Sequence, residues 1–190
     1  MKKELQKIAE IISSGGVGII PTDTIYGVVG SAFSKKAVEK IYQLKKRDSQ
    51  KPFIILISSK KDLNLFGIKL RSGEQRKINK LWPGKVSILL SCPQEKFAYL
   101  HRGTGELAFR FPRREELIRM IKITGPLVAP SANPSGKKPS ETIEQAKKYF
   151  KKEVDFYADG GKLSSLPSAL VRISGKNIEI IRQGELKLGK

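Results

Sequence analysis

Residues able to bind a ligand gather in three polar segments, each placed after an apolar stretch of the chain. The first, residues 21–27, directly follows the apolar run 17–20. It holds the hydroxyls of Thr22 and Thr24, the carboxylate of Asp23 and the phenol of Tyr26, so it supplies hydrogen-bond donors and acceptors together. A helix N-cap by Thr22 or Asp23 explains the same residue types, and both interpretations stay open.

The second polar segment, residues 45–52, carries four cations between an expected helix and an expected strand. Lys45 and Lys46 fall in the last helical turn, where positive charge already interacts favourably with the helix dipole. Arg47 and Lys51 lie beyond that turn. A guanidinium binds phosphate oxygens in a two-pronged geometry and an ammonium acts as a point charge, so these two residues are candidate phosphate ligands.

The third polar segment, residues 129–136, reads Ala-Pro-Ser-Ala-Asn-Pro-Ser-Gly and follows an apolar stretch. Its small residues let a ligand approach the backbone, and Ser131, Asn133 and Ser135 add polar side chains. A proline-rich turn is the alternative. Because loops at strand ends commonly present ligand-binding side chains, we expect the three segments to face a shared crevice.

The scarcity of cysteine and histidine, and the absence of standard phosphate-binding motifs, exclude several kinds of functional site. The single cysteine, Cys92, rules out an internal disulfide, and with one histidine, His101, a Cys/His zinc site is excluded as well. No nucleophile motif lies near His101, which argues against a serine or cysteine hydrolase. No Gly-Lys pair is followed by Ser or Thr as in a P-loop, and the G-x-G-x-x-A match at 103–108 leads into an expected strand.

The charge of the chain points to anionic partners. Lys and Arg number 37 against 18 Asp and Glu, a net charge of +19 in 190 residues. Such a field attracts nucleic acid or phosphate-bearing ligands, although a lysine-rich surface also favours solubility. No apolar run has the length of a membrane span, so we expect a cytoplasmic protein with no membrane partner. The length and the absence of a linker predict one domain over residues 1–190.

Hydrophobic spacing predicts a mixed α/β sheet rather than a regularly doubly wound one. Helices are expected over 5–12, 35–44 with Ser34 as cap, 60–66, 73–81, 114–123 and 142–150. Strands are expected over 17–20, 53–57, 86–90, 107–111, 127–129, 156–158, 169–173 and 178–182. The last two strands flank Ser174-Gly175-Lys176-Asn177 and are expected to form an antiparallel hairpin.

Seven motifs in a fixed order make the chain resemble the YrdC-like threonylcarbamoyl-AMP synthases in their short, single-domain bacterial form. They are Pro-Thr-Asp-Thr-Ile-Tyr-Gly from Pro21, Lys45-x-Arg47 with Lys51-Pro52, Trp82-Pro83-Gly84, Arg110-Phe111-Pro112, Ser131-Ala132-Asn133 with Ser135-Gly136, Pro167-Ser168, and Ile181-Arg182-Gln183-Gly184. The resemblance covers nearly the whole chain. It implies a twisted, open sheet of parallel and antiparallel strands with flanking helices and a positively charged concave face.

The resemblance also implies a nucleotidyltransferase that condenses L-threonine, bicarbonate and ATP to threonylcarbamoyl-adenylate and pyrophosphate, for tRNA modification. Mg²⁺ would accompany ATP without a protein metal cluster. The implied partners beyond the substrates are tRNA or double-stranded RNA and downstream tRNA-modifying proteins. The implied site residues are Thr24, Tyr26 and Ser168 for threonine; Arg47, Lys51, Ser87, Arg110, Ser131, Asn133 and Arg182 for the nucleotide; and Lys45, Arg47 and Lys51 for catalysis.

Three departures from the family pattern keep other functions open. Lys85 adds a cation after Trp82-Pro83-Gly84, Leu56 stands where some members have histidine, and Ala169 replaces a usual threonine. These changes fit a nucleotide-binding paralogue that acts on another substrate. An RNA-binding module without catalysis explains the positive charge equally well but explains the 22–26 cluster poorly.

Overall fold

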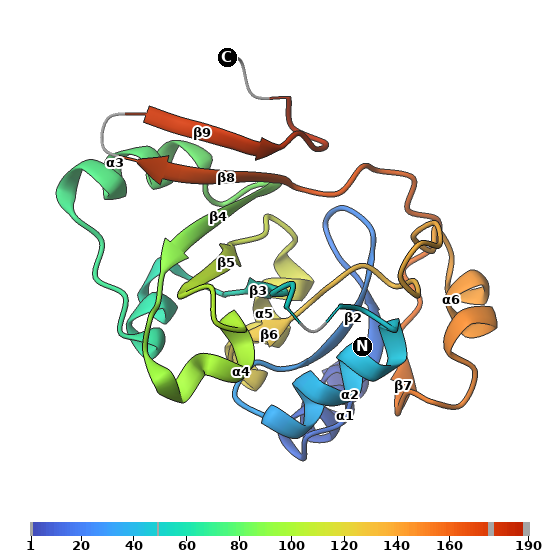
Figure 1. Ribbon diagram of the computed structural model, residues 1–190. Helices are drawn as coiled ribbons and strands as arrows, with labels where there is room; N and C mark the ends of the chain where they lie inside the picture. The colour runs from blue at the N-terminus through green and yellow to red at the C-terminus, as the bar shows by residue number, and fades with distance from the viewer. Residues whose placement is uncertain (1, 49, 175–176, 188–190) are drawn as a thin grey trace.

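A mixed nine-stranded sheet runs through the molecule, which the computed structural model describes over residues 2–48, 50–174 and 177–187 (Figure 1). Its order is β7-β1-β2-β6-β3-β5-β4-β8-β9. The strands are β1 (Gly18–Pro21), β2 (Tyr26–Ser31), β3 (Ile54–Leu56), β4 (Val86–Ser91), β5 (Glu106–Arg110), β6 (Leu127–Val128), β7 (Phe156–Tyr157), β8 (Ala169–Ser174) and β9 (Asn177–Arg182).

Parallel and antiparallel pairs alternate irregularly across this sheet. β1 pairs antiparallel with β2, β4 with β5, and β8 with β9, whereas β7 runs parallel to β1, β3 to β5, and β8 to β4. β6 lies antiparallel between β2 and β3 and so joins the two halves of the sheet. The mixed sheet predicted from the sequence is confirmed, as is the terminal hairpin; Gly175 and Lys176 of its predicted turn lie outside the described residues.

Helices cover both faces of the sheet (Figure 1). They are α1 (Lys2–Ser13), α2 (Lys35–Lys45), α3 (Ser72–Leu81), α4 (Ala98–His101), α5 (Glu115–Thr124) and α6 (Ile143–Phe150), with 3₁₀ turns η1 (Lys60–Phe66) and η2 (Glu95–Phe97). α1 and α5 bury Ile12, Leu117 and Ile121 in one core cluster, and the other helices pack in the larger cluster. Among the described helices, none combines the length and apolarity needed to cross a membrane.

Helix α2 forms as the sequence predicts, and its last residues deliver the second polar segment. The Ser34 hydroxyl accepts a hydrogen bond from the Ala37 amide at 3.2 Å and caps the helix. Ala37, Val38 and Ile41 are buried on its inner face. The helix ends where Lys46 takes the left-handed conformation at φ 48°, so Arg47 leaves the helix axis and turns back toward the sheet.

The structure corrects the sequence analysis in the first polar segment. Residues 22–25 form the loop of the β1–β2 hairpin, and no helix begins at Thr22 or Asp23, so the N-cap interpretation is wrong. β2 itself was not predicted, although almost every residue in it is buried. A Cβ on Gly30 would approach the Ala37 Cβ to 3.0 Å, which shows why α2 can pack so closely on this strand.

Three short helical segments also differ from expectation, among them η2, which was not predicted. The predicted helix over 60–66 is the 3₁₀ turn η1, at whose start the Asp62 carboxylate accepts from the Ser59 amide at 3.3 Å and the Ser59 hydroxyl at 2.9 Å. α4 was not predicted, and it buries His101, the single histidine of the chain.

Candidate functional site

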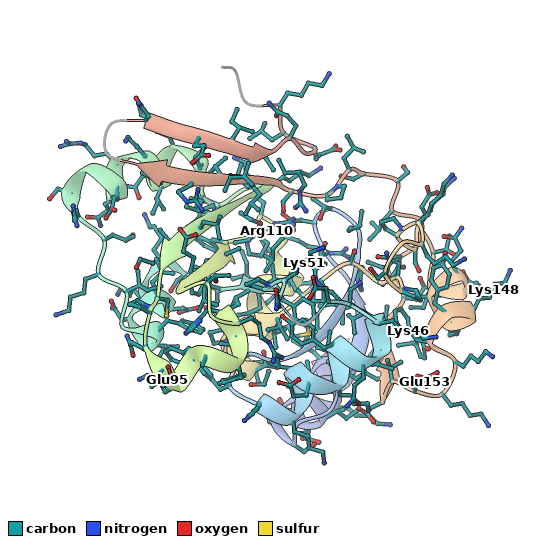
Figure 2. The ribbon with its side chains drawn as sticks, viewed as in Figure 1. Lys46, Lys51, Glu95, Arg110, Lys148 and Glu153 are labelled. Carbon is teal, nitrogen blue, oxygen red and sulfur yellow. The ribbon has the colours of Figure 1, made fainter. Side chains whose placement is uncertain are left out.

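A cavity of about 140 Å³ lies where the three polar segments and the terminal hairpin meet. Arg110, at the end of β5, lies near the middle of the ribbon in Figure 2 and forms part of the cavity wall. The polar lining residues are Thr22, Thr24, Tyr26, Arg47, Arg110, Ser131, Ser168 and Arg182. The other lining residues are Ile25, Gly27, Phe53, Ile54, Leu56, Ala129, Pro130, Pro167 and Leu170.

The wall formed by the β1–β2 loop is built around a buried arginine. The Arg110 guanidinium donates to the Thr24 hydroxyl at 3.0 Å and forms an ion pair with Asp23, whose second oxygen accepts from the Arg113 amide at 3.4 Å. Arg110 is 4% exposed and Thr24 is 2% exposed. Burial lowers the pKa of Arg110, while the Asp23 carboxylate acts in the opposite direction.

Three arginines from distant parts of the chain converge on this cavity. Arg47 comes from the end of α2, Arg110 from β5 and Arg182 from β9. Partial desolvation at the cavity, followed by repulsion from Arg47, lowers the pKa of Arg182. Within the described residues, Asp23 is the sole carboxylate that pairs with one of the three, so the cavity presents an excess of positive charge to a ligand.

Arg47 is held in place before any ligand binds. Its Nε donates to the Lys51 carbonyl at 3.2 Å and its Nη2 to the Pro52 carbonyl at 3.4 Å. Its guanidinium lies over the Phe53 ring, 5.5 Å from the centroid. A restrained guanidinium loses less conformational entropy on binding an anion than a free one.

Lys45 is buried beneath the cavity and holds the third polar segment. Its ammonium donates to the carbonyl oxygens of Ser131 and of Asn133, the latter at 2.6 Å, and the Lys45 carbonyl accepts from the Ser135 amide at 2.7 Å. Lys45 is 2% exposed. Burial and, to a smaller extent, the neighbouring Arg47 lower the pKa of Lys45 to about 7.

The segment held by Lys45 is also fixed to β2. Val28 donates its amide to the Pro130 carbonyl at 2.9 Å, and Ala132 donates to the Tyr26 carbonyl at 2.8 Å. The Asn133 amide group donates to the carbonyls of Pro134 and Lys137, at 3.0 and 2.7 Å. Asn133 therefore shapes the loop with its nitrogen, while its buried oxygen has no partner among the described residues.

Two serine hydroxyls join β4 to the segment before β8. Ser87 Oγ and Ser168 Oγ lie 2.9 Å apart, both buried, and Arg182 Nη2 donates to the Ser168 carbonyl at 3.0 Å. Ser168 lines the cavity, whereas Ser87 lies behind it. Ser87 thus reaches a ligand through Ser168 rather than directly.

Tyr26 fixes the chain segment between β7 and β8. Its hydroxyl donates to the Gly161 carbonyl at 2.7 Å, lies 3.1 Å from Asp159 Oδ1 and accepts from the Gly160 amide at 2.9 Å. Burial is the main cause that raises the pKa of Tyr26. The phenol is fully engaged with this loop, and the ring forms part of the cavity wall.

The structure brings most of the predicted site residues to one cavity, with four exceptions. Thr24, Tyr26, Arg47, Arg110, Ser131, Ser168 and Arg182 line it. Lys45, Ser87 and Asn133 are buried directly behind the lining, where they contact its backbone or side chains. Lys51 lies on an exposed turn, with its ammonium 3.7 Å from Asp48 and its side chain 67% exposed.

Part of the apolar lining was not predicted to belong to the site. Ile54 and Leu170 lie on strands and Phe53 directly precedes β3, and the alternation and burial of such residues look the same in a core as in a cavity wall. The other apolar lining residues were already named in the sequence: Leu56 at the position of the family's histidine, Pro167 in the Pro-Ser motif, and Ile25, Gly27, Ala129 and Pro130 within the first and third polar segments. Leu56 in the lining means that the position where some family members carry histidine faces this cavity with an apolar side chain.

A second, open depression of about 650 Å³ adjoins the cavity across the loop formed by Thr22, Asp23 and Thr24. Its remaining lining residues are Lys85, Arg113, Arg114, Lys162, Leu163, Ser164, Ser165 and Glu185. Lys85 forms an ion pair with Glu185 at 3.4 Å. Over the described part of the chain, no group of three or more His, Cys, Asp or Glu residues is arranged to hold a metal ion.

Comparison with known proteins identifies the family. Residues 10–184 match the family of Sua5, YciO and YrdC proteins, which carries the description "Telomere recombination". A putative threonylcarbamoyl-AMP synthase of Methanocaldococcus jannaschii is 32% identical over 190 residues, which cover all of this chain and 89% of the relative. The chain belongs to the Sua5/YciO/YrdC family.

Solved structures agree with the fold. Pyrococcus abyssi Sua5 complexed with L-threonine superposes with a TM-score of 0.89 at 25% identity, covering 97% of this chain and 55% of the longer protein. Escherichia coli YciO, at 20% identity, has a TM-score of 0.86 and covers 97% of this chain and 90% of its own. The predicted family and the predicted sheet architecture are both confirmed.

Proposed function

We propose that this protein is a threonylcarbamoyl-AMP synthase, which condenses L-threonine, bicarbonate and ATP to threonylcarbamoyl-adenylate and pyrophosphate. The observation that carries the proposal is the convergence of Arg47, Arg110 and Arg182 with the Thr24 and Ser168 hydroxyls on one cavity. Relatives named for this activity and the threonine complex of Sua5 support it.

The size of the cavity suits the amino-acid end of the reaction. Its volume of about 140 Å³ is below the roughly 300–1,000 Å³ of sites for drug-sized ligands, so a whole nucleotide has to extend beyond it. Threonine would contact Thr24 and Ser168, with Tyr26 shaping the wall. The nucleotide would lie toward Arg47, Arg182 and the Ser131–Asn133 loop that Lys45 holds.

The proposed chemistry needs charge neutralisation more than a titrating base. The amino group of threonine forms a carbamate, either from bicarbonate with loss of water or from dissolved carbon dioxide with loss of a proton. A carbamate oxygen then attacks the α-phosphorus of ATP. The bond from that phosphorus to the bridging oxygen of the β-phosphate breaks, and pyrophosphate leaves. Because both reactants are anionic, Arg47 and Arg182 would align them and stabilise the charge that develops.

Magnesium fits this site as a companion of ATP. The carboxylate of Asp23, next to the lining residues Thr22 and Thr24, is already paired with Arg110 and the Arg113 amide, so phosphate oxygens and water would hold the ion. Mg²⁺ would supply further neutralisation of the phosphates. The catalytic roles of Lys45, Arg47 and Lys51 remain predictions, with Lys45 acting through the backbone of the Ser131–Asn133 loop.

RNA binding is a second candidate function, favoured by the open depression beside the cavity. Lys85, Arg113, Arg114 and Lys162 line it and can contact backbone phosphates of tRNA or double-stranded RNA.

The positively charged concave face is likewise a prediction. Hand-over of the product to tRNA-modifying proteins, and hence a cytoplasmic location, follows from the proposed activity. We also propose a single domain, since both core clusters flank one sheet.

The proposal is tested by measuring pyrophosphate release from ATP with threonine and bicarbonate, each omitted in turn. Release should require both, because the attacking group is made from both. Equal release without threonine supports a paralogue or a contaminating ATPase, and replacement of threonine by another amino acid at full rate indicates another substrate. RNA binding without any nucleotide turnover favours the RNA-binding module.

A further inference from the structure

We propose that Asp23 is a positioning residue for the amino-acid end of the site. Through Arg110 it sets the direction of a hydrogen-bond chain that leaves the Thr24 hydroxyl able to accept a hydrogen bond from the substrate. This inference rests on the proposed function, because it takes the cavity to bind an amino acid. Asp23 has no other role in the proposed reaction.

The direction of the chain follows from counting protons. Thr22 Oγ1 lies 2.6 Å from the Ile25 carbonyl, which can only accept, so the single hydroxyl proton of Thr22 is donated there. Thr22 Oγ1 also accepts from the Thr24 amide at 3.1 Å, and it lies 3.2 Å from Thr24 Oγ1. Because Thr22 has no second proton to give, Thr24 must be the donor in that contact.

Arg110 fixes the other side of the Thr24 hydroxyl. Its Nη1 can only donate, and it lies 3.0 Å from Thr24 Oγ1. The proton of Thr24 and one of its lone pairs are therefore used within the protein. The chain runs one way, from Arg110 through Thr24 and Thr22 to the Ile25 carbonyl.

One lone pair of Thr24 is left for a ligand, and this determines what it can recognise. A hydroxyl in this state accepts from an N–H or O–H donor, and it repels a carboxylate or phosphate oxygen placed at the same point. Threonine offers two such donors, its amino group and its side-chain hydroxyl. Thr24 therefore binds a donor group of the amino acid and not its carboxylate, which is instead attracted to the arginines.

Asp23 is what keeps Arg110 in this arrangement. Its carboxylate bridges Arg110 and the Arg113 amide, with its side chain 8% exposed. Arg182 repels Arg110, and no other carboxylate of the described residues pairs with it. Without Asp23, nothing would offset the repulsion from Arg182 or the cost of burying the Arg110 charge. The Arg110 guanidinium would then turn toward solvent or the ligand and lose its hydrogen bond to Thr24.

The test compares Asp23→Asn with Asp155→Asn by calorimetric titration of L-threonine and, separately, of ATP. Asp155 makes the same two kinds of contact, with Lys40 at 2.9 Å and the Val17 amide at 2.7 Å, but neither partner lines the cavity, whereas Arg110 does. We expect Asp23→Asn to weaken threonine binding roughly tenfold and ATP binding less than about twofold. Asp155→Asn should leave both affinities unchanged.

A double variant separates positioning from stability. Asp23→Asn with Arg110→Met removes both charges, so thermal stability should recover toward that of the wild type. Threonine affinity should stay weak, because Thr24 has lost its fixed donor. Recovery of threonine affinity together with stability, or equal losses for threonine and ATP in Asp23→Asn, would overturn the proposal.

L-2-Aminobutyrate, which lacks the hydroxyl of threonine, identifies the donor that Thr24 accepts from. If Asp23→Asn removes the preference for threonine over aminobutyrate, the donor is the hydroxyl; if both ligands weaken equally, it is the amine. Unchanged affinity for both ligands contradicts the positioning role. Failure of the wild type to bind threonine refutes the proposed function instead, so the two failures are distinct.

Discussion

The ammonium of Lys45 donates a hydrogen bond to the carbonyl oxygen of Asn133 at 2.6 Å, across 88 residues of sequence. This contact ties the end of α2 to the loop that follows β6. Arg47, two residues after Lys45, and Ser131, within that loop, both line the same cavity. The geometry of the cavity therefore depends on a buried cation that itself does not line it.

This burial predicts an unusual dependence of stability on pH. The pKa of Lys45 is about 7 in the folded protein and near 10.5 in the unfolded chain. Between these values the unfolded chain holds one more proton, so stability rises with pH through this window; below pH 7 both states are protonated and the dependence ends. We would measure the free energy of unfolding in urea for wild type and Lys45→Met at pH 6.5 and pH 9. From the lower to the higher pH, this free energy should rise by at least about 1 kcal/mol more in the wild type than in the variant.

Lys46→Met is the matched control for this measurement, because Lys46 is the next residue and its side chain is exposed. It should not change the pH dependence of the wild type. If the difference in free energy of unfolding between wild type and Lys45→Met is the same at both pH values, Lys45 does not titrate in this range.

Arg47→Ala should weaken ATP binding with little effect on the fold. Arg47 is held by backbone carbonyls and the Phe53 ring, ready to bind phosphate oxygens. Charge-assisted hydrogen bonds contribute on the order of 1.5–3 kcal/mol, so we expect a loss of roughly 10- to 150-fold in ATP affinity by calorimetry. Arg119→Ala on the exposed side of α5 is the control. An unchanged dissociation constant would remove Arg47 from the nucleotide site.

Lys51→Ala should have a smaller effect than Arg47→Ala. Its ammonium lies on an exposed turn and interacts with Asp48 at 3.7 Å, so solvent and salt screen it. We expect a loss of less than about fivefold in ATP affinity, and one that disappears as ionic strength rises. A loss as large as that of Arg47→Ala, and independent of salt, would mean that the turn closes over bound ATP.

Tyr26→Phe should loosen the segment between β7 and β8 more than it destabilises the whole protein. The phenol makes three contacts with Asp159, Gly160 and Gly161, and its loss leaves two backbone groups unpaired at a cost of about 1–3 kcal/mol. Hydrogen exchange should accelerate over residues 159–165 and stay unchanged in α1. Uniform acceleration across the protein would instead indicate global destabilisation.

The sequence predicted most elements because their apolar spacing is regular. α2, α5 and α6 each bury a face of residues three and four apart, and β4 and β8 are short apolar runs. β2 escaped prediction because its two glycines and its position after a polar loop are typical of a turn. Both glycines lie close to neighbouring elements, since an added Cβ would lie 3.0 Å from the Ala37 Cβ at Gly30 and 3.3 Å from the Thr22 methyl at Gly27, and this tertiary packing has no local signal in the sequence.

The site divides in the same way. Ordered motifs predicted which residues converge, and Thr24, Arg47, Arg110 and Arg182 do meet. Local pattern could not reveal that Lys45 is buried against a loop 88 residues away, whereas Lys51, six residues further on, is exposed. The role of Asp23 was equally hidden, because its partner Arg110 is distant in sequence.

The edge position of β9 has a consequence for binding. β9 pairs with β8 alone among the described strands, its side chains are mostly exposed, and it carries Arg182 into the cavity. Edge strands with little buried surface open at lower free energy than the rest of a sheet. A ligand that contacts Arg182 binds the state in which β9 is paired with β8. Such a ligand should slow amide exchange in β8 and β9 and leave exchange in α1 unchanged. The measured affinity for the nucleotide then also depends on the fraction of molecules in which β9 is paired with β8.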